Sequence, residues 1–271
     1  MELPTLNAVD RVTREEINTL VNLGCCYVRI PEPEIFKHFK IIKREALAFF
    51  RQDEIKKQKW FAHGKVEGYI DRSIDDIHSV QQFLFRLKNP SGPFKECRNS
   101  VFKISNYCEE RIIIVLLKEI FSYFGVEDYF EEVVIDSDLS SSFSIAYYPA
   151  KVNTKKKSNS GMKAHKDYDL MTVILMDKPG LEVFWDDQWH DVNPQPGYGV
   201  LFLSETLEKM LGGRINSIIH RVRIPDEERI SIGVFKGPNT NIPIRDYIND
   251  QILFDSHEQC LEHHRQLFRG E

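Results

Sequence analysis

Two stretches of the sequence decide the fold. Residues 163–176 are KAHKDYDLMTVILM, and residues 217–236 are SIIHRVRIPDEERISIGVFK. The first places His165 and Asp167 two residues apart, a spacing that directs both side chains to one face of a strand. The second contains His220. Two imidazoles and one carboxylate are the ligands of a non-heme Fe(II) site that leaves one face of the metal open. The spacing therefore predicts a metal site made by His165, Asp167 and His220.

Arg229 and Ser231 follow His220 closely and stand two residues apart on a strand-like segment. A guanidinium group binds a carboxylate through two parallel hydrogen bonds, and a buried carboxylate needs such pairing. A His-x-Asp pair alone is weak evidence because it often arises by chance. Together with His220, Arg229 and Ser231, it suggests an oxygenase that consumes a 2-oxo acid.

The segments around these residues have the sequence pattern typical of an all-β barrel or sandwich. From Ser140 onward, short runs rich in Val, Ile, Phe and Tyr alternate with turn residues. The predicted strands are Ser142–Tyr148, Leu170–Met176, Leu181–Trp185, Gly199–Phe202, Ile215–His220 and Ile230–Phe235. One short helix, Glu205–Leu211, interrupts them.

The first half of the chain has helical periodicity instead. Thr13 and Glu16 form a capping-box pattern at the start of a first helix, which Gly24 ends. Apolar spacing predicts two long helices, at about 34–57 and 101–124. Short strands are expected at Val9–Asp10 and Cys26–Ile30, and the tail from Pro243 is expected to be helical.

Composition indicates a cytoplasmic globular protein. The 271 residues are 42% hydrophobic and 28% charged, and the net charge of -5 argues against nucleic acid as a partner. The five cysteines have no CxxC spacing, so we expect them to be reduced. No apolar stretch approaches the length of a membrane span, and no targeting segment is visible at the N-terminus.

The motifs around the predicted metal site occur in a specific order. They are Tyr147-Tyr148-Pro149, Ala164-His165-Lys166-Asp167, Pro179-Gly180-Leu181-Glu182-Val183, Trp189 with Val192, Thr206-Leu207-Glu208, Ser217-Ile218-Ile219-His220-Arg221-Val222 and Arg229-Ile230-Ser231. From about residue 143 to 238 this order resembles the isopenicillin N synthase-like branch of the Fe(II)/2-oxoglutarate-dependent dioxygenases. Residues 9–90 match that branch more loosely.

The resemblance implies a mainly β fold with flanking α-helices around a double-stranded β-helix, or jelly-roll, core. We expect a single oxygenase domain over 1–271. Within it, 1–135 would be a mostly helical buttress with pocket loops, 136–240 the jelly-roll core with the iron site, and 241–271 a helical tail.

The resemblance also assigns roles to residues. His165, Asp167 and His220 would hold Fe(II), and Arg229, Ser231 and Tyr148 would bind 2-oxoglutarate as cosubstrate. The reaction would use O2, release succinate and CO2, and hydroxylate, desaturate or cyclise a small molecule, with ascorbate as a candidate reductant. No catalytic residue beyond the metal ligands is implied.

Substrate contacts are less clearly marked. Phe235 matches a family position that often faces substrate, although it could equally be a core residue. Tyr69 lies in a Gly- and Pro-rich segment that could form pocket loops, and core packing is the simpler interpretation for it. Lys155–Lys157 could belong to a lid over an anionic substrate or to a solvated loop.

Two departures from the family pattern concern the cosubstrate. Ala146 stands where the family often has Asn, and Ser204–Glu205 replaces a Gly-Asp pair. Two alternatives therefore remain open. One is an iron-dependent oxidase of the same fold that does not use 2-oxoglutarate, and the other is a non-catalytic jelly-roll binding module. The sequence does not indicate the oligomeric state.

Overall fold

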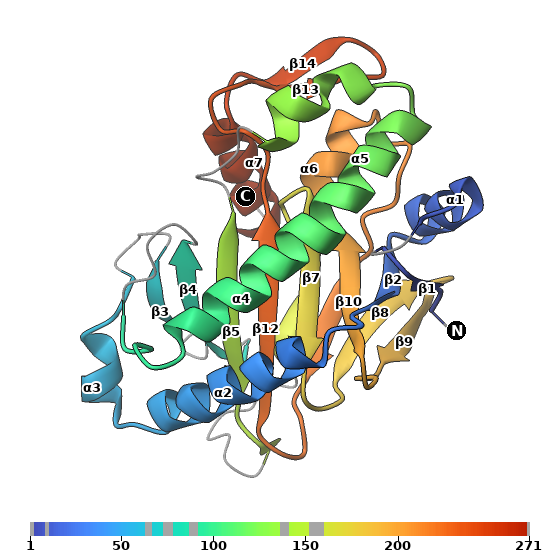
Figure 1. Ribbon diagram of the computed structural model, residues 1–271. Coiled ribbons are helices and arrows are strands. Elements are labelled where there is room, and N and C mark those ends of the chain that lie inside the picture. The colour runs from blue at the N-terminus through green and yellow to red at the C-terminus, as the bar shows by residue number, and fades with distance from the viewer. Residues whose placement is uncertain are drawn as a thin grey trace.

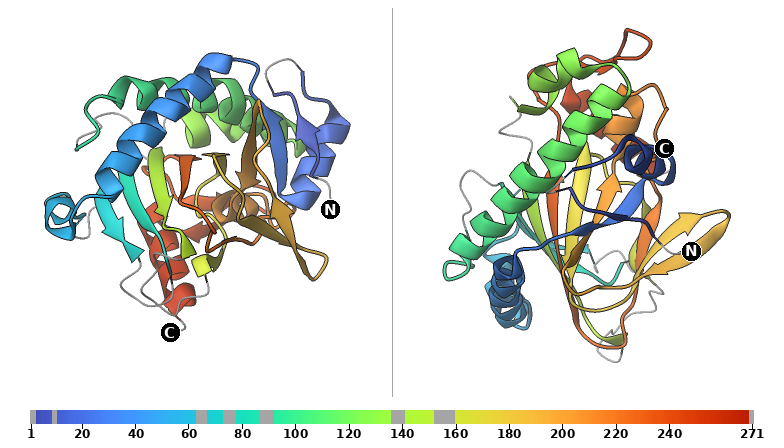
Figure 2. Two further views of the ribbon diagram at one scale, coloured as in Figure 1. Left: turned by 90° about the horizontal axis from the view of Figure 1, so that it is seen from below. Right: turned by 45° about the vertical axis from the view of Figure 1, so that its right-hand side comes forward.

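The computed structural model describes residues 3–8, 11–62, 67–72, 78–86, 92–135, 141–151 and 160–269. Its main elements are two β-sheets and an outer layer of helices (Figures 1 and 2). This arrangement confirms a mainly β fold with flanking helices. The predicted Val9–Asp10 strand and the Lys155–Lys157 loop lie outside the described residues.

The large sheet has eight strands in the order β1-β2-β10-β7-β12-β5-β4-β3. They are β1 (Thr5–Leu6), β2 (Cys25–Arg29), β3 (Gly68–Asp71), β4 (Gln81–Arg86), β5 (Ser142–Tyr148), β7 (Met171–Met176), β10 (Tyr198–Leu203) and β12 (Arg229–Lys236). Four of these strands come from the first half of the chain. The N-terminal region, whose described elements are mostly helical, thus also adds strands to the sheet.

The small sheet has four strands in the order β6-β11-β8-β9. They are β6 (Ser160–His165), β8 (Leu181–Trp185), β9 (Gln188–Val192) and β11 (His220–Arg223). Apolar side chains of both sheets pack together in one cluster that includes Val183, Val222, Val200 and Phe202. The two sheets therefore face each other, and the space between them is where a site can form.

The described α-helices are α1 (Arg14–Leu23), α2 (Pro33–Phe50), α3 (Glu54–Gln58), α4 (Arg98–Cys108), α5 (Ile114–Tyr123), α6 (Glu205–Met210) and α7 (His257–Arg269). Three of them cover the face of the large sheet that is turned away from the small sheet. α2, α4 and α5 cross this face in Figures 1 and 2. Their apolar stripes meet the alternate residues Phe143 and Ile145 of β5 and Ile230 and Ile232 of β12 in the largest core cluster.

Helix ends differ from the predictions in two places. The helix expected at about 34–57 ends at Phe50, and a separate short helix begins after Asp53. The helix expected at 101–124 is divided into α4 and α5 by a wider π-helical turn, Glu109–Ile113. The first helix was predicted correctly, with the Thr13–Glu16 capping box in place.

The C-terminal tail is only partly helical, which corrects the prediction for 241–271. A hairpin of β13 (Ile244–Asp246) and β14 (Gln251–Phe254) precedes α7. The Asp246 carboxylate accepts hydrogen bonds from the backbone N–H groups of Ile248 and Asn249, and Asp250 has a positive φ of 55°. Turn chemistry of Asp and Asn, which helical periodicity does not reveal, produces the hairpin.

Residues 215–219 were predicted as a strand, but the strand begins only at His220. The backbone N–H of Asn216 bonds to Val21, and its side-chain amide donates to the carbonyl of Leu23 at 3.1 Å. The end of α1 therefore takes the hydrogen bonds that a neighbouring strand would otherwise make.

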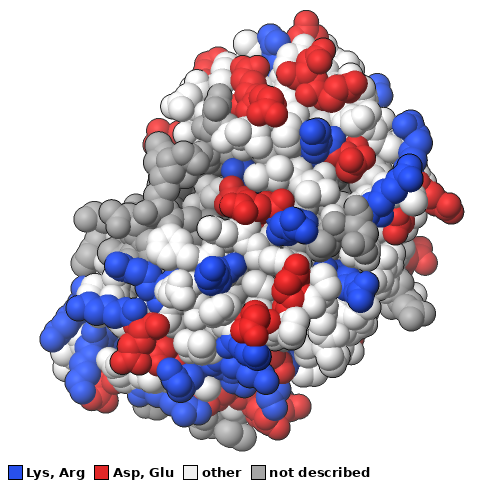
Figure 3. Space-filling model, viewed as in Figure 1, with Lys and Arg blue, Asp and Glu red and all other residues white. Residues whose placement is uncertain are grey.

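Charged groups of both signs are spread over the face seen in Figure 3, with Lys and Arg gathered over α2 and α3. Several of these cations pair with carboxylates, as Lys37 does with Glu34, and Lys43 with Asp177 at 2.7 Å. Within the described parts of the chain, no helix is both long and apolar enough to cross a membrane.

Candidate metal centre and carboxylate clamp

His165, Asp167 and His220 meet at one end of the small sheet. His165 is the last residue of β6 and His220 the first of β11, and the two are direct partners in the antiparallel ladder. Their ring centroids lie 4.2 Å apart. Asp167 lies two residues beyond the end of β6, in a loop rather than on the expected strand. Its Oδ1 is 3.7 Å from Nε2 of each histidine.

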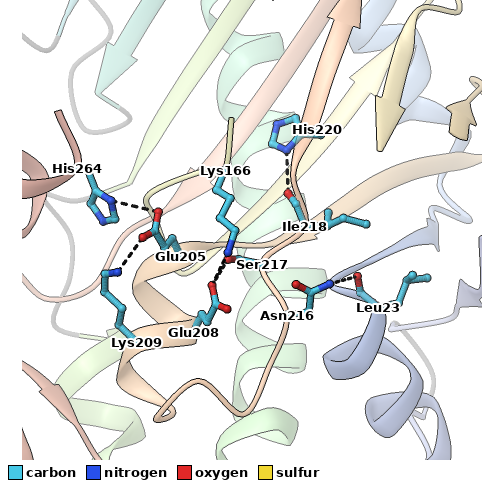
Figure 4. A network of polar contacts seen from close by, with 10 residues as sticks. All are labelled: Leu23, Lys166, Glu205, Glu208, Lys209, Asn216, Ser217, Ile218, His220 and His264. Carbon is cyan, nitrogen blue, oxygen red and sulfur yellow. Dashed lines mark hydrogen bonds and ion pairs between the residues drawn. The ribbon is translucent and has the colours of Figure 1, made fainter. Parts of the chain in front are cut away.

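Backbone carbonyls orient both imidazole rings. Nδ1 of His165 lies 2.8 Å from the carbonyl oxygen of Lys163. Nδ1 of His220 lies 3.3 Å from the carbonyl oxygen of Ile218, a contact drawn in Figure 4. A proton on Nδ1 satisfies each carbonyl and leaves the Nε2 lone pair directed toward Asp167. Burial, and then the neighbouring His220, lower the pKa of His165 to about 4, with a smaller contribution from Arg72 in the same direction. Its ring is therefore neutral near pH 7.

The three residues suit a divalent cation. One ligand atom from each lies within 4.8 Å of the others. The second carboxylate oxygen of Asp167 is buried and has no hydrogen-bond partner among the described residues. A buried carboxylate oxygen without a partner is costly unless a cation or donor completes it. Two imidazoles and a carboxylate form the donor set of a non-heme Fe(II) site.

Helix α6 supports the loop that carries Asp167. The backbone N–H of Glu205 donates to the carbonyl of Asp167 at 2.8 Å, and the Thr206 hydroxyl donates to the carbonyl of Tyr168. Phe202 stacks on the His220 ring with centroids 4.5 Å apart and an interplanar angle of 5°. The ligands are therefore held in place by packed neighbours.

Arg229 lies on β12 of the large sheet, inside the same pocket, with only 1% of its surface exposed. Its guanidinium donates to the Lys178 carbonyl at 3.1 Å and the Ser231 hydroxyl at 3.3 Å, and contacts Met176 Sδ at 3.2 Å. The Tyr148 ring lies 4.9 Å away. Among the described residues, no carboxylate forms an ion pair with this buried cation.

Asp177 is an acidic residue whose charge acts on Arg229, but its carboxylate already has other partners. Its carboxylate pairs with Lys43 and accepts the backbone N–H of Ile230 at 2.9 Å. Burial lowers the pKa of Arg229, and Tyr148 and Asp177 act in the opposite direction. Arg229 can therefore bind an additional carboxylate that enters the pocket.

A single pocket between the two sheets joins these groups. Its lining includes the metal-centre residues His165, Asp167 and His220, the clamp residues Arg229, Ser231 and Tyr148, and also Phe235, Gln82 and Ser144. The sequence interpretation had singled out all of these except Gln82 and Ser144. Gln82 lies in a Gly- and Pro-rich segment for which no strand was predicted. Ser144 occupies an ordinary alternating position in the predicted strand Ser142–Tyr148, so its residue type gave no indication of a functional role.

Tyr69 does not line this pocket. It is fully buried, and its ring packs against Phe49 and Phe50 at centroid distances of 5.8 Å and 6.4 Å. The pocket role suggested for Tyr69 is therefore not supported, because β3 directs this side chain to the helical face of the sheet.

Residues 139–238 match the profile of the 2OG-Fe(II) oxygenase superfamily. The chain is 26% identical over 239 residues to the rice (Oryza sativa subsp. japonica) 2-oxoglutarate-dependent dioxygenase 21, covering 83% of this chain and 68% of the relative. It is 24% identical over 248 residues to DMR6-LIKE OXYGENASE 2 of Arabidopsis thaliana, covering 89% of this chain and 67% of the relative.

Solved structures share the fold. JOX2 in complex with 2OG, Fe and JA superposes with a TM-score of 0.76 at 20% identity, covering 98% of this chain and 85% of that chain. The dioxygenase for auxin oxidation of rice gives 0.76 at 16% identity, covering 100% and 96%. These matches confirm the jelly-roll prediction. The profile match and the curated relatives place residues 139–238 in the 2OG-Fe(II) oxygenase superfamily.

Proposed function

We propose that the protein oxidises a small molecule while converting 2-oxoglutarate and O2 into succinate and CO2. In a hydroxylation, one oxygen atom of O2 enters the substrate and the other enters succinate, so the reaction balances without a further reductant. Desaturation and oxidative cyclisation are the other outcomes of the same site. His165, Asp167 and His220 would hold Fe(II), and Arg229, Ser231 and Tyr148 would hold 2-oxoglutarate.

One observation carries the proposal: two charged side chains that line one pocket are each incompletely paired among the described residues. Asp167 has a buried oxygen without a partner, and Arg229 is a buried cation without a carboxylate among the described residues. A metal ion would complete the first group, and the distal carboxylate of a 2-oxo acid would complete the second. A single bound molecule that carries a carboxylate at one end and a chelating 2-oxo acid at the other could reach both.

Each residue has a separable task. The bound iron supplies the oxidising chemistry. Arg229 fixes one end of the cosubstrate through its fork of donors, and Ser231 adds a hydroxyl on the same face of β12. Tyr148 is buried; burial raises its pKa, while Arg229 and Ser231 act to lower it. Its phenol therefore stays protonated at neutral pH and can donate a hydrogen bond.

Two finer assignments belong to the proposal. The order of motifs from Tyr147 to Ser231 supports membership in the isopenicillin N synthase-like branch. The five cysteines are free and buried, which supports a reducing compartment such as the cytoplasm.

The test is an anaerobic titration of metal-free protein with Fe(II) and then 2-oxoglutarate, followed by visible spectroscopy. We expect a weak charge-transfer band that needs both additions and is absent from His165→Ala. His190→Ala is the matched control, because His190 lies on β9 and outside the pocket lining. Iron binding without the band would favour the oxidase that does not use 2-oxoglutarate. Failure to bind iron would favour the binding module.

Arg229→Gln tests the clamp separately. Iron affinity should be unchanged, whereas 2-oxoglutarate affinity should fall strongly, since breaking a buried charge pair from one side costs about 3–5 kcal/mol. An unchanged affinity for 2-oxoglutarate would show that Arg229 has been misassigned.

A further inference from the structure

Arg72 is an exposed cation just beyond β3, the edge strand of the large sheet. β3 pairs with β4 so that Ile70 lies opposite Gln82, and Gln82 lines the pocket. Arg72 follows Ile70 by two residues, and its backbone N–H bonds to the Val80 carbonyl at 3.1 Å. The strand pairing therefore continues past the end of β3. The side chain of Arg72 leaves the backbone on the same face of the sheet as the side chain of Gln82.

The two side chains are joined directly. Nε of Arg72 donates to Oε1 of Gln82 at 2.6 Å. This bond occupies the carbonyl end of the Gln82 amide, so its NH2 group remains available as a donor. No carboxylate in the described parts of the chain forms an ion pair with Arg72, and its two terminal nitrogens can donate hydrogen bonds to an anionic ligand.

Ser144, which lines the same pocket as Gln82, provides a second and independent observation. It lies on β5 between Leu84 of β4 and Gly233 of β12. Its side chain lines the pocket and is only 3% exposed, yet its hydroxyl has no hydrogen-bond partner among the described residues. Buried hydroxyls are normally satisfied, so a polar atom of a bound molecule is the natural partner for Ser144.

We propose that the substrate carries a carboxylate, which Arg72 and Gln82 bind at the β3–β4 edge of the pocket, while Ser144 contacts a further polar atom of the substrate. The inference rests on the proposed oxygenase function and names its substrate class. One guanidinium with neutral donors suits a singly charged acid, and its planar fork matches a carboxylate. The cosubstrate has its own cation, Arg229 on β12, two strands away from β4 in the sheet order.

The experiment uses the iron-loaded protein with saturating 2-oxoglutarate and measures succinate release in air. The probes are aromatic, alicyclic and straight-chain carboxylic acids, each with its primary amide, methyl ester and the corresponding phosphate monoester. We expect acids alone to raise succinate release above the substrate-free rate. Arg72→Gln should raise the KM for the best acid at least tenfold, and Arg72→Lys should recover part of the loss.

Two controls keep this result separate from the proposed function. The charge-transfer band with 2-oxoglutarate should be unchanged in Arg72→Gln, since Arg72 is not part of the cosubstrate clamp. Arg111→Gln, an exposed arginine in the helical layer, should leave the KM unchanged. Absence of the band in the wild-type protein would refute the proposed function itself.

With the band present, four results would overturn the substrate proposal. They are stimulation by amides or esters equal to that by acids, preference for phosphate monoesters, no stimulation by any acid, and an unchanged KM in Arg72→Gln. Loss of 2-oxoglutarate affinity in Arg72→Gln would also overturn it, because it would assign Arg72 to the cosubstrate.

Discussion

The ammonium group of Lys166 lies 2.9 Å from the carboxylate of Glu208 (Figure 4). The same Glu208 oxygen accepts a hydrogen bond from the Ser217 hydroxyl. Lys166 stands between the proposed ligands His165 and Asp167, and Ser217 precedes His220 by three residues. One side chain of α6 therefore joins the two segments that carry the metal centre, although Glu208 itself does not line the pocket.

Glu208→Ala should weaken Fe(II) binding by about tenfold to a hundredfold, the usual effect of removing a group that orients metal ligands. The reason is that both ligand segments lose a shared anchor, while the three ligands remain. Anaerobic Fe(II) titration measures the change.

Glu119→Ala is the matched control, since Glu119 is exposed on α5 and does not line the pocket. If Glu208→Ala lowered thermal stability but left iron affinity equal to that of the control, the anchoring role would be wrong.

Gly24, at the C-terminal end of α1, allows the backbone of the segment that precedes His220 to approach closely. Its φ is +84°, and a Cβ placed there would lie 2.3 Å from the backbone oxygen of Asn216 and 3.1 Å from the backbone nitrogen of Ile218. Gly24→Ala should therefore lower the free energy of unfolding by about 2–4 kcal/mol, combining left-handed strain with a backbone clash. Denaturant unfolding measures it.

Gly125→Ala separates these two causes. Gly125 also has a positive φ, +71°, but open space surrounds its Cβ position. This variant should lose only about 1–2 kcal/mol. Equal losses in the two variants would mean that the approach of Asn216 to Gly24 does not matter.

Gly233 makes room for the Phe235 ring in the pocket. A Cβ at Gly233 would lie 2.6 Å and 2.7 Å from two atoms of that ring. Gly233→Ala should displace the ring and cost about 1–2 kcal/mol of stability, measured by denaturant unfolding. Adding Phe235→Leu should recover part of that loss, because the smaller side chain removes the conflict. Strictly additive losses in the double variant would contradict this contact.

Much of the metal centre could be predicted because it follows from local geometry. The β-rich segments around His165 and His220 indicated strand ends for both residues, although His220 was expected to end a strand and instead begins β11. An arginine two residues before a serine pointed to a carboxylate. The family resemblance supplied Tyr148. Whether these residues act as ligands and clamp stays a prediction until the titrations are made.

The remaining features depend on partners that are distant in the sequence. Glu208 gains its importance only where α6 meets both Lys166 and Ser217, and Arg72 only where β3 and β4 join the large sheet. Residues 215–219 had strand-like composition, but hydrogen bonds from the end of α1 replaced the strand pairing. Tertiary contacts of this kind override local propensity, so sequence patterns alone do not reveal them.

Glu205 makes the docking of α7 sensitive to acid. Its carboxylate lies 2.7 Å from Lys209 Nζ and 3.1 Å from Nδ1 of His264 on α7. Burial by itself raises the pKa of Glu205, but His264 and Lys209 outweigh it and hold the pKa at about 2. An unfolded glutamate titrates near 4.3. The ionised carboxylate therefore stabilises the fold above about pH 4.3, and this contribution is lost as the pH falls toward 2.

Glu205→Gln should accordingly be less stable than the wild-type protein by about 2 kcal/mol at pH 7, a value reduced for partial solvent screening. The difference should shrink steadily below pH 4.3 and vanish near pH 2. Urea unfolding of both proteins across this range measures the difference, with Glu119→Gln as the exposed control. A difference that stayed constant down to pH 2 would mean that shape and hydrogen bonding, rather than the charge of Glu205, hold α7 against α6.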